Sequence, residues 1–179
     1  VAALVPHGDP VRKVSIISRG RAGGYTLKLP SEERHLKNKA EFLSELAILL
    51  GGYAAEQLQF KDVTTGPSND LEKASEVARS LVKQFGMSEK VGPVTLGQAE
   101  ESTFLGRRGM ESQNYSEKMA EQIDKEVGKL LDNARKTAES LLQKNKATLE
   151  KIAKVLIEKE TIEREEFERI IGNKQKKGT

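Results

Sequence analysis

A metal site in this sequence has to use histidine and carboxylate side chains, because none of the 179 residues is cysteine. The lack of cysteine excludes disulfides, thiol nucleophiles and thiolate metal sites, and it is compatible with a reducing compartment. The two histidines, His7 and His35, are far from the four-residue spacing with which two imidazoles share one helix face. We expect His7 to be a turn residue and His35 to be exposed at a helix entry, and neither to bind a metal.

The most informative carboxylate is Asp70, in the segment TTGPSNDLEKA (residues 64–74). It comes just before an apolar run with helical spacing, where an aspartate commonly caps the helix and interacts with the positive end of its dipole. Ser68 and Asn69 could cap the same helix. Three suitable caps in a row indicate that at least one of these residues has another role, so capping and ligand binding both remain open for Asp70.

The elements that must position Asp70 indicate a mainly α protein with a small two- or three-stranded β element near the N-terminus. Residues 11–17 have the β-branched character of a short strand, and residues 25–29 alternate between polar and apolar side chains. Two strands alone are marginally stable in water. The small sheet must therefore pack against helices.

Helical periodicity dominates the rest of the chain. Residues 37–60 carry an apolar stripe that Gly51-Gly52 interrupts, which predicts either a kink or the close approach of another backbone. Residues 71–85 form a one-sided amphipathic helix that ends at Gly86. A long helix begins at Ser116, with a packing seam at Ala120, Ile123, Val127, Leu130, Ala134, Ala138 and Leu141.

The C-terminal part is expected to be a helical hairpin or bundle. The long helix breaks near Asn145, a second helix follows, and a short helix ends before Gly172. We expect one domain over residues 1–179, divided into a half with the small sheet and Asp70 (1–86), an irregular loop (87–114), the helical bundle (115–172) and a basic tail (173–179). Arg107-Arg108 in the loop could meet an acidic partner, but a solvated pair is the favoured interpretation.

The charge pattern argues against nucleic-acid binding. The chain has 30 basic and 27 acidic residues, only 4% aromatic residues and no tryptophan. Nucleic-acid-binding surfaces usually gather Lys and Arg on one face together with stacking aromatic side chains. No apolar stretch approaches the roughly 20 residues that cross a bilayer.

The segment at Asp70, together with Ala78-Arg79 and FGMS (85–88), closely resembles the part of FtsH-type ATP-dependent zinc metalloproteases that supplies their third metal ligand. Further segments resemble the same family in the same order: DPVRKV (9–14), GYT (24–26), LLGGYAAE (49–56), FLGR (104–107) and the C-terminal stretch 158–167. The order of these pieces carries the resemblance.

The resemblance implies a zinc peptidase. Two histidines of a His-Glu-x-x-His helix and Asp70 would bind Zn²⁺, with water in the fourth position and the motif's Glu as general base. Glu56 and Asn69 would lie beside the metal ligands, with Glu56 orienting a ligand histidine. For Glu56, an ordinary helix-surface carboxylate remains an equal alternative.

The sequence departs from the family pattern because it has no His-Glu-x-x-His motif. The resemblance therefore implies that the catalytic residues precede Val1, that residues 1–5 end the helix bearing them, and that this chain alone is inactive. Tyr53 and Gln57 also stand where the family commonly has a basic and an acidic residue.

For the intact protein the resemblance implies a membrane-anchored homo-hexamer that hydrolyses unfolded or membrane polypeptides, with this domain on the cytoplasmic or an organelle-matrix-like side. ATP and Mg²⁺ would bind a separate ATPase domain. The strand at Gly24, Tyr25 and Thr26 would pair with an extended substrate. The alternative is a non-catalytic helical module of a protease-dead relative, in which the seam of residues 123–141 serves assembly.

Overall fold

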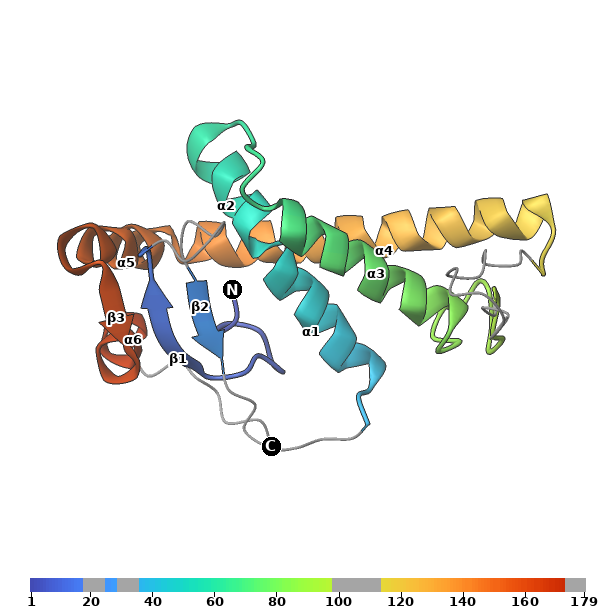
Figure 1. Cartoon of the computed structure of the whole chain (residues 1–179), viewed down its shortest axis with the longest axis horizontal. Helices are drawn as coiled ribbons and strands as arrows, with labels where there is room; N and C mark the ends of the chain where they lie inside the picture. Colours follow the sequence, from blue (N-terminus) through green and yellow to red (C-terminus); the bar gives the residue numbers. More distant parts are fainter. Residues whose placement is uncertain (18–24, 29–35, 98–113, 173–179) are drawn as a thin grey trace, which may run out of the picture.

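The computed structural model describes residues 1–17, 25–28, 36–97 and 114–172 (Figure 1). The strands are β1 (Val11–Ser15), β2 (Tyr25–Lys28) and β3 (Thr161–Glu163), and the helices are α1 (Lys39–Leu49), α2 (Gly51–Phe60), α3 (Ser68–Lys83), α4 (Glu117–Lys144), α5 (Lys146–Lys159) and α6 (Arg164–Ile171). The predicted mainly α fold with a small sheet is confirmed. Gly24, His35, Arg107-Arg108, most of the predicted loop and the tail 173–179 lie outside the described residues.

The long helix α4 runs along α1, α2 and α3 (Figure 1) and contacts all three. It begins at Ser116 as predicted, and the Ser116 hydroxyl accepts the Met119 N–H at 3.3 Å. The predicted seam is buried at Ile123, Val127, Ala134 and Ala138. In the last turn Leu142 is buried in place of Leu141, because 3.6 residues per turn moves an apolar stripe gradually around the helix.

The interruption at Gly51-Gly52 is a break between α1 and α2 at Leu50. A Cβ on Gly51 would lie 3.0 Å from Val1 Cγ2. The neighbour that approaches this glycine is therefore a side chain from the start of the chain and not another backbone. Residues 1–5 form a turn, in which the Leu4 N–H donates to the Val1 carbonyl at 2.8 Å and the Val5 N–H to the same carbonyl at 3.3 Å. That they end a longer helix stays a prediction.

A side-chain cap for α3, one of the two alternatives for Asp70, is contradicted by the structure. The helix begins at Ser68 with Pro67 in the N-cap position, and no side-chain hydrogen bond is made there. Ser68, Asn69 and Asp70 all lie in the first turn. Proline has no N–H to satisfy and a φ already close to the helical value, so it can precede a helix without a capping side chain.

The sheet joins the two ends of the sequence. Its order is β2-β1-β3 with antiparallel pairing, and Val14 lies opposite both Thr26 and Ile162. A second core forms beneath it from Val11, Leu156, Ile162, Phe167 and Ile171. The sequence patterns did not predict β3, which follows α5 and pairs with β1 from the opposite end of the chain.

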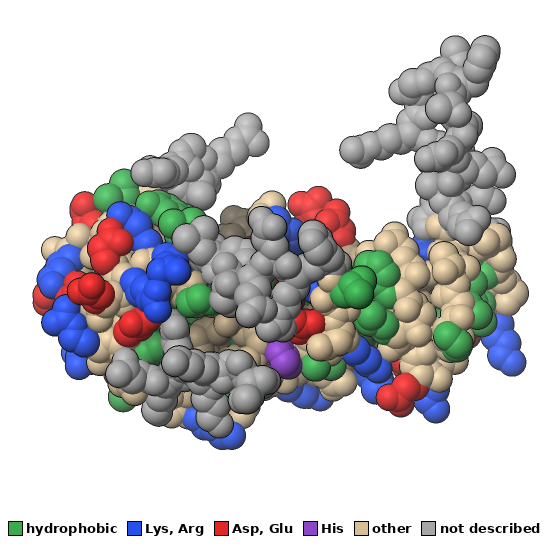
Figure 2. Space-filling model, turned by 90° about the horizontal axis from the view of Figure 1, so that it is seen from below, with side chains coloured by type: hydrophobic (Ala, Val, Ile, Leu, Met, Phe, Trp, Pro, Cys, Tyr) green, Lys and Arg blue, Asp and Glu red, His purple; other side chains and the backbone are tan. Residues whose placement is uncertain are grey.

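The described surface is highly charged. Figure 2 shows Lys and Arg side chains interspersed with Asp and Glu side chains, most densely at the end that Figure 1 assigns to α5 and α6. Within the described ranges, no helix combines the length and the apolar character that crossing a bilayer requires.

Candidate functional site

The site begins with Asp70, which is half-buried in the first turn of α3. This turn holds the backbone N–H groups that carry the positive end of the helix dipole, so a carboxylate is favourable there without being the cap. The Leu71 N–H donates to the Pro67 carbonyl at 2.9 Å, which fixes the helical path through the residue before it. Asn69 lies in the same turn and is exposed.

Two other segments lie close to the start of α3. A Cβ on Gly52 would lie 3.9 Å from Pro67 Cβ, and Gly51 next to it faces Val1. Val1 also packs against the small cluster of Ala54, Ala138 and Leu142. The first residue and the first turns of α2 and α3 therefore meet at one place, close to the N-terminus marked in Figure 1.

Glu56 on α2 orders the loop that leads into α3. Its Oε2 accepts the Thr64 N–H at 2.7 Å, and its Oε1 accepts the Thr64 hydroxyl at 3.0 Å. The Thr64 Oγ1 in turn accepts the Gly66 N–H at 3.0 Å. Glu56 therefore fixes the approach to the helix that carries Asp70, and both of its carboxylate oxygens already have a donor.

Gly66 makes this loop geometry possible. A Cβ at this position would lie 3.1 Å from Thr64 Oγ1 and 3.3 Å from Glu56 Oε1, which is closer than ordinary van der Waals contact. Thr64 is the residue of this group that sequence reasoning did not single out. The sequence does hold a clue to Thr64, because it is a hydroxyl residue shortly before a Gly-Pro turn. From this position its side chain can accept a hydrogen bond from the backbone N–H two residues further on.

The donor set for a metal is incomplete in the part of the chain that the structure describes. No three His, Cys, Asp or Glu side chains come together there in a group that could hold an ion. His7 is exposed in a turn, as expected. A zinc site needs three protein ligands or more, so the described residues alone do not fit zinc, and a site that used Asp70 would need further ligands.

The predicted substrate strand lies at an edge of the sheet. Tyr25 and Thr26 belong to β2 and pair with Ser15 and Val14 of β1, and β2 is the outer strand in the order β2-β1-β3. Thr26 is exposed. An edge strand offers a row of backbone groups to an extended peptide, so the arrangement is compatible with the predicted strand addition.

Comparison with known proteins gives one consistent result. Residues 1–170 match the profile of the family described as "Peptidase family M41". The chain is 46% identical over 178 residues to "ATP-dependent zinc metalloprotease FtsH 1" of Thermoanaerobacter sp. (strain X514), which covers 99% of the chain and 29% of that protein.

Two further relatives agree. The identity is 48% over 168 residues to "ATP-dependent zinc metalloprotease FtsH 1" of Thermomicrobium roseum, covering 94% of the chain and 26% of the relative. It is 46% over 178 residues to the FtsH of Thermotoga maritima, covering 99% of the chain and 29% of the relative. The chain thus spans less than a third of the length of these relatives.

Proposed function

The chain belongs to peptidase family M41, and its relatives named above are FtsH zinc metalloproteases. We therefore propose that it is the part of a peptidase domain that supplies the aspartate ligand of the zinc. The match of residues 1–170 to the family carries this proposal. In the proposal residues 1–179 belong to one domain, and the two histidine ligands and the general base come from elsewhere in the intact protein.

Asp70 is the proposed ligand. Its half-buried place in the first turn of α3 supports this role. Pro67, just before that turn, lies near Gly52 of α2, and Val1 lies near Gly51, so the start of the chain is close to the start of α3. Glu56 would act by holding the 61–67 loop, and Asn69 would lie beside the metal ligands. When bound, zinc would activate a water molecule for hydrolysis.

The intact protein is proposed to work as the names of its relatives indicate, as an ATP-dependent zinc protease. ATP and Mg²⁺ would be bound outside this chain, and polypeptides would be the substrates. Membrane anchoring, a homo-hexameric state and a cytoplasmic or matrix-like location for this domain belong to the same proposal.

The first prediction concerns Asp70. In the full-length protein, Asp70→Ala should reduce bound zinc from about one ion per chain to a small fraction and abolish casein cleavage, because removing one of three protein ligands weakens the site strongly. Metal analysis of the purified protein and a casein assay provide the measurement. Glu72→Ala, an exposed carboxylate two residues further on, is the matched control and should retain both. Full zinc content and cleavage in Asp70→Ala would refute the assignment.

The 179-residue chain by itself should bind zinc weakly and should not cleave casein. The reason is that one carboxylate cannot hold the ion tightly and no His-Glu-x-x-His motif is present to supply a base. Proteolysis by this chain would show that the proposed division of the site is wrong.

The second prediction concerns the edge strand. In the full-length protein, Thr26→Pro should reduce casein cleavage several-fold and leave zinc content unchanged, because proline removes a backbone donor from β2 without touching Asp70. Thr26→Val keeps the backbone donor and the strand propensity and should cleave normally. Unchanged turnover of Thr26→Pro would argue against substrate pairing with β2.

The alternative of a non-catalytic assembly module had the seam of residues 123–141 packing either on its own neighbours or on other subunits. Ile123, Val127 and Ala134 are buried in one cluster with residues of α1 and α3. In the described part of the chain this seam is therefore occupied by the fold itself.

A further inference from the structure

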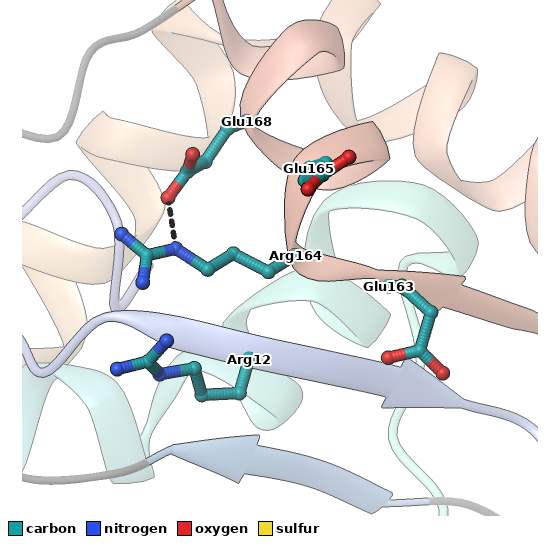
Figure 3. Close-up of a pocket in the computed structure, with 5 residues that line it drawn as sticks. All are labelled: Arg12, Glu163, Arg164, Glu165 and Glu168. Atoms are coloured by element: carbon teal, nitrogen blue, oxygen red, sulfur yellow. Dashed lines mark hydrogen bonds and ion pairs between the residues drawn. The ribbon is translucent and has the colours of Figure 1, made fainter.

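A polar pocket lies where β1, β3 and the first turn of α6 meet (Figure 3). Its volume is about 540 Å³, and it is lined by Arg12, Glu163, Arg164, Glu165 and Glu168. In Figure 1 α6 lies beneath β3 and α5, well apart from the start of α3. The pocket is thus a different place from the proposed metal site.

Arg12 is brought to this pocket by a β-bulge. Val11 pairs with Lys28 and Lys13 pairs with Leu27, so β1 has one residue more than β2 between these pairs, and that residue is Arg12. Bulges redirect side chains and occur often next to functional sites. The Arg12 Nε is buried and has no hydrogen-bond partner among the described residues. Such a donor is normally satisfied, so it indicates a missing acceptor.

Arg164 supplies the second cation. Its Nε donates to Glu168 Oε1 at 2.6 Å, and this bond orients the guanidinium from the side of α6. Figure 3 shows the guanidinium groups of Arg12 and Arg164 at the same end of the pocket, one from the strand and one from the helix. Glu168 already neutralises Arg164, whereas Arg12 takes part in no ion pair found among the described residues, so a bound anion would mainly compensate the charge of Arg12.

The surrounding carboxylates restrict the kind of anion. Glu163 is paired with Lys13 at 2.6 Å and Glu168 with Arg164, which leaves Glu165 as a further negative charge in the lining. Three carboxylates disfavour a doubly charged phosphate more than a singly charged anion. A carboxylate also matches the planar fork of a guanidinium, which can donate two parallel hydrogen bonds to it.

We propose that Arg12 and Arg164 form a binding site for a carboxylate group, supplied by a small organic acid or by the C-terminus of a peptide. The site is independent of the proposed peptidase function, because neither zinc nor hydrolysis enters it. Arg12 provides the unpaired donor and Arg164 the oriented one.

The test is an NMR titration of the ¹⁵N-labelled 179-residue chain that follows the arginine Nε–H signals. Sodium acetate is added at constant ionic strength against sodium chloride. The signals of Arg12 and Arg164, assigned from Arg12→Gln and Arg164→Gln, should shift to saturation, and the signal of Arg169 should not. Arg12→Gln should weaken acetate binding, read at Arg164, at least tenfold. Arg169→Gln, an exposed arginine of the same helix, should bind acetate as the parent does.

Two additions sharpen the outcome. Arg12→Lys keeps the positive charge but loses the planar pair of guanidinium donors, and it should weaken acetate binding nearly as much as Arg12→Gln. Because this variant keeps the charge, its weaker binding would point to lost recognition of the carboxylate and not to a loss of folding. A peptide with a free C-terminus is compared with its amidated form. Tighter binding of the free acid alone identifies a peptide terminus, whereas binding of acetate with no gain from either peptide identifies a small acid.

Three results would overturn the proposal. The first is a shift that does not saturate beyond the effect of chloride. The second is phosphate binding as tight as that of acetate, because the charge argument excludes it. The third is equal binding of both peptides with a higher affinity than acetate, because recognition would then not depend on the carboxylate.

Discussion

At the level of single residues, Glu56 shows how a carboxylate near a proposed ligand can act through the backbone. It accepts both the N–H and the hydroxyl of Thr64, and Thr64 then accepts the Gly66 N–H. The start of α3, and with it Asp70, depends on this short chain of hydrogen bonds. From the sequence, Glu56 could be either an ordinary helix-surface carboxylate or a residue beside the metal ligands. In the structure its carboxylate holds the loop between α2 and α3.

The third prediction follows from this anchor. Glu56→Ala should lower the free energy of unfolding by about 1–2 kcal/mol, because two partly exposed hydrogen bonds of about 1 kcal/mol or less each are lost. The Thr64 and Gly66 amides should exchange with solvent faster. Denaturant unfolding and amide hydrogen exchange provide the measurements. Gln57→Ala, the exposed neighbour on α2, is the control and should change neither by more than about 0.5 kcal/mol.

Gly86 was expected from the sequence to end the amphipathic helix that became α3, and its backbone conformation agrees with this. Its φ of 59° is left-handed, as expected for a glycine that ends a helix. The structure adds a tertiary reason for glycine, because a Cβ there would lie 2.9 Å from the Pro93 Cα. Conformation and space both favour glycine at this position.

At the level of elements, α4 combines a buried face with an exposed face of ion pairs. Arg135 binds both Asp132 and Glu139, and Lys136 binds Asp132 at 2.6 Å. The hydrogen bonds from Lys136 and Arg135 lower the pKa of Asp132 below its ordinary value of 3.8. Because the folded-state pKa is lowered, the stabilisation from Asp132 is present above pH 3.8 and is lost as the pH falls below it.

The fourth prediction is therefore an acid-dependent loss of stability through α4. The melting temperature of the parent should fall as the pH is lowered through and below 3.8. Asp132→Asn should have a lower melting temperature than the parent at neutral pH, and its melting temperature should fall less on acidification. Melting curves from about pH 7 to about pH 2 test it, and added salt should reduce the difference.

Asp124→Asn is the matched control for this series. Asp124 is exposed on α4 and takes part in none of the ion pairs found among the described residues. Its substitution should leave the acid dependence of the parent. An Asp132→Asn curve that runs parallel to the parent curve at every pH would contradict the role of these pairs.

At the level of the whole molecule, the fold has two main cores. One is formed by α1, α3 and α4 around Leu46 and Leu81, and the other by the sheet with α5 and α6 around Ile162. The helices α4 and α5 meet at Asn145, so the second core is attached to the first through this junction and a smaller cluster around Ala138.

The fifth prediction is that the two cores can be weakened separately. Ile162→Ala should cost about 2–4 kcal/mol, because it removes a fully buried side chain and leaves a cavity. Hydrogen exchange should increase mainly in β1, β3 and α6. Leu46→Ala, equally buried in the first core, should increase exchange mainly in α1, α3 and α4. An equal loss of protection in both regions for either variant would show that the molecule opens as one unit.

The sequence by itself determined the helical elements, their approximate ends and the family. Ser116, Asn145 and Gly172 mark real helix ends, and the seam on α4 is buried, because helix periodicity and termination depend on residues within a few positions of one another. It also placed Asp70 at the start of a helix, although its role as a zinc ligand remains a prediction.

Only the tertiary structure decided what depends on distant residues. Examples are the pairing of β1 with β3, the bonds of Glu56 to Thr64, the side chain of Val1 against Gly51, and the presence of Arg12 and Arg164 in the lining of one pocket. Local patterns state which residues are apolar or charged and how they repeat. They do not contain the path that brings the two ends of the chain into one sheet, because that path is fixed by packing of the whole fold.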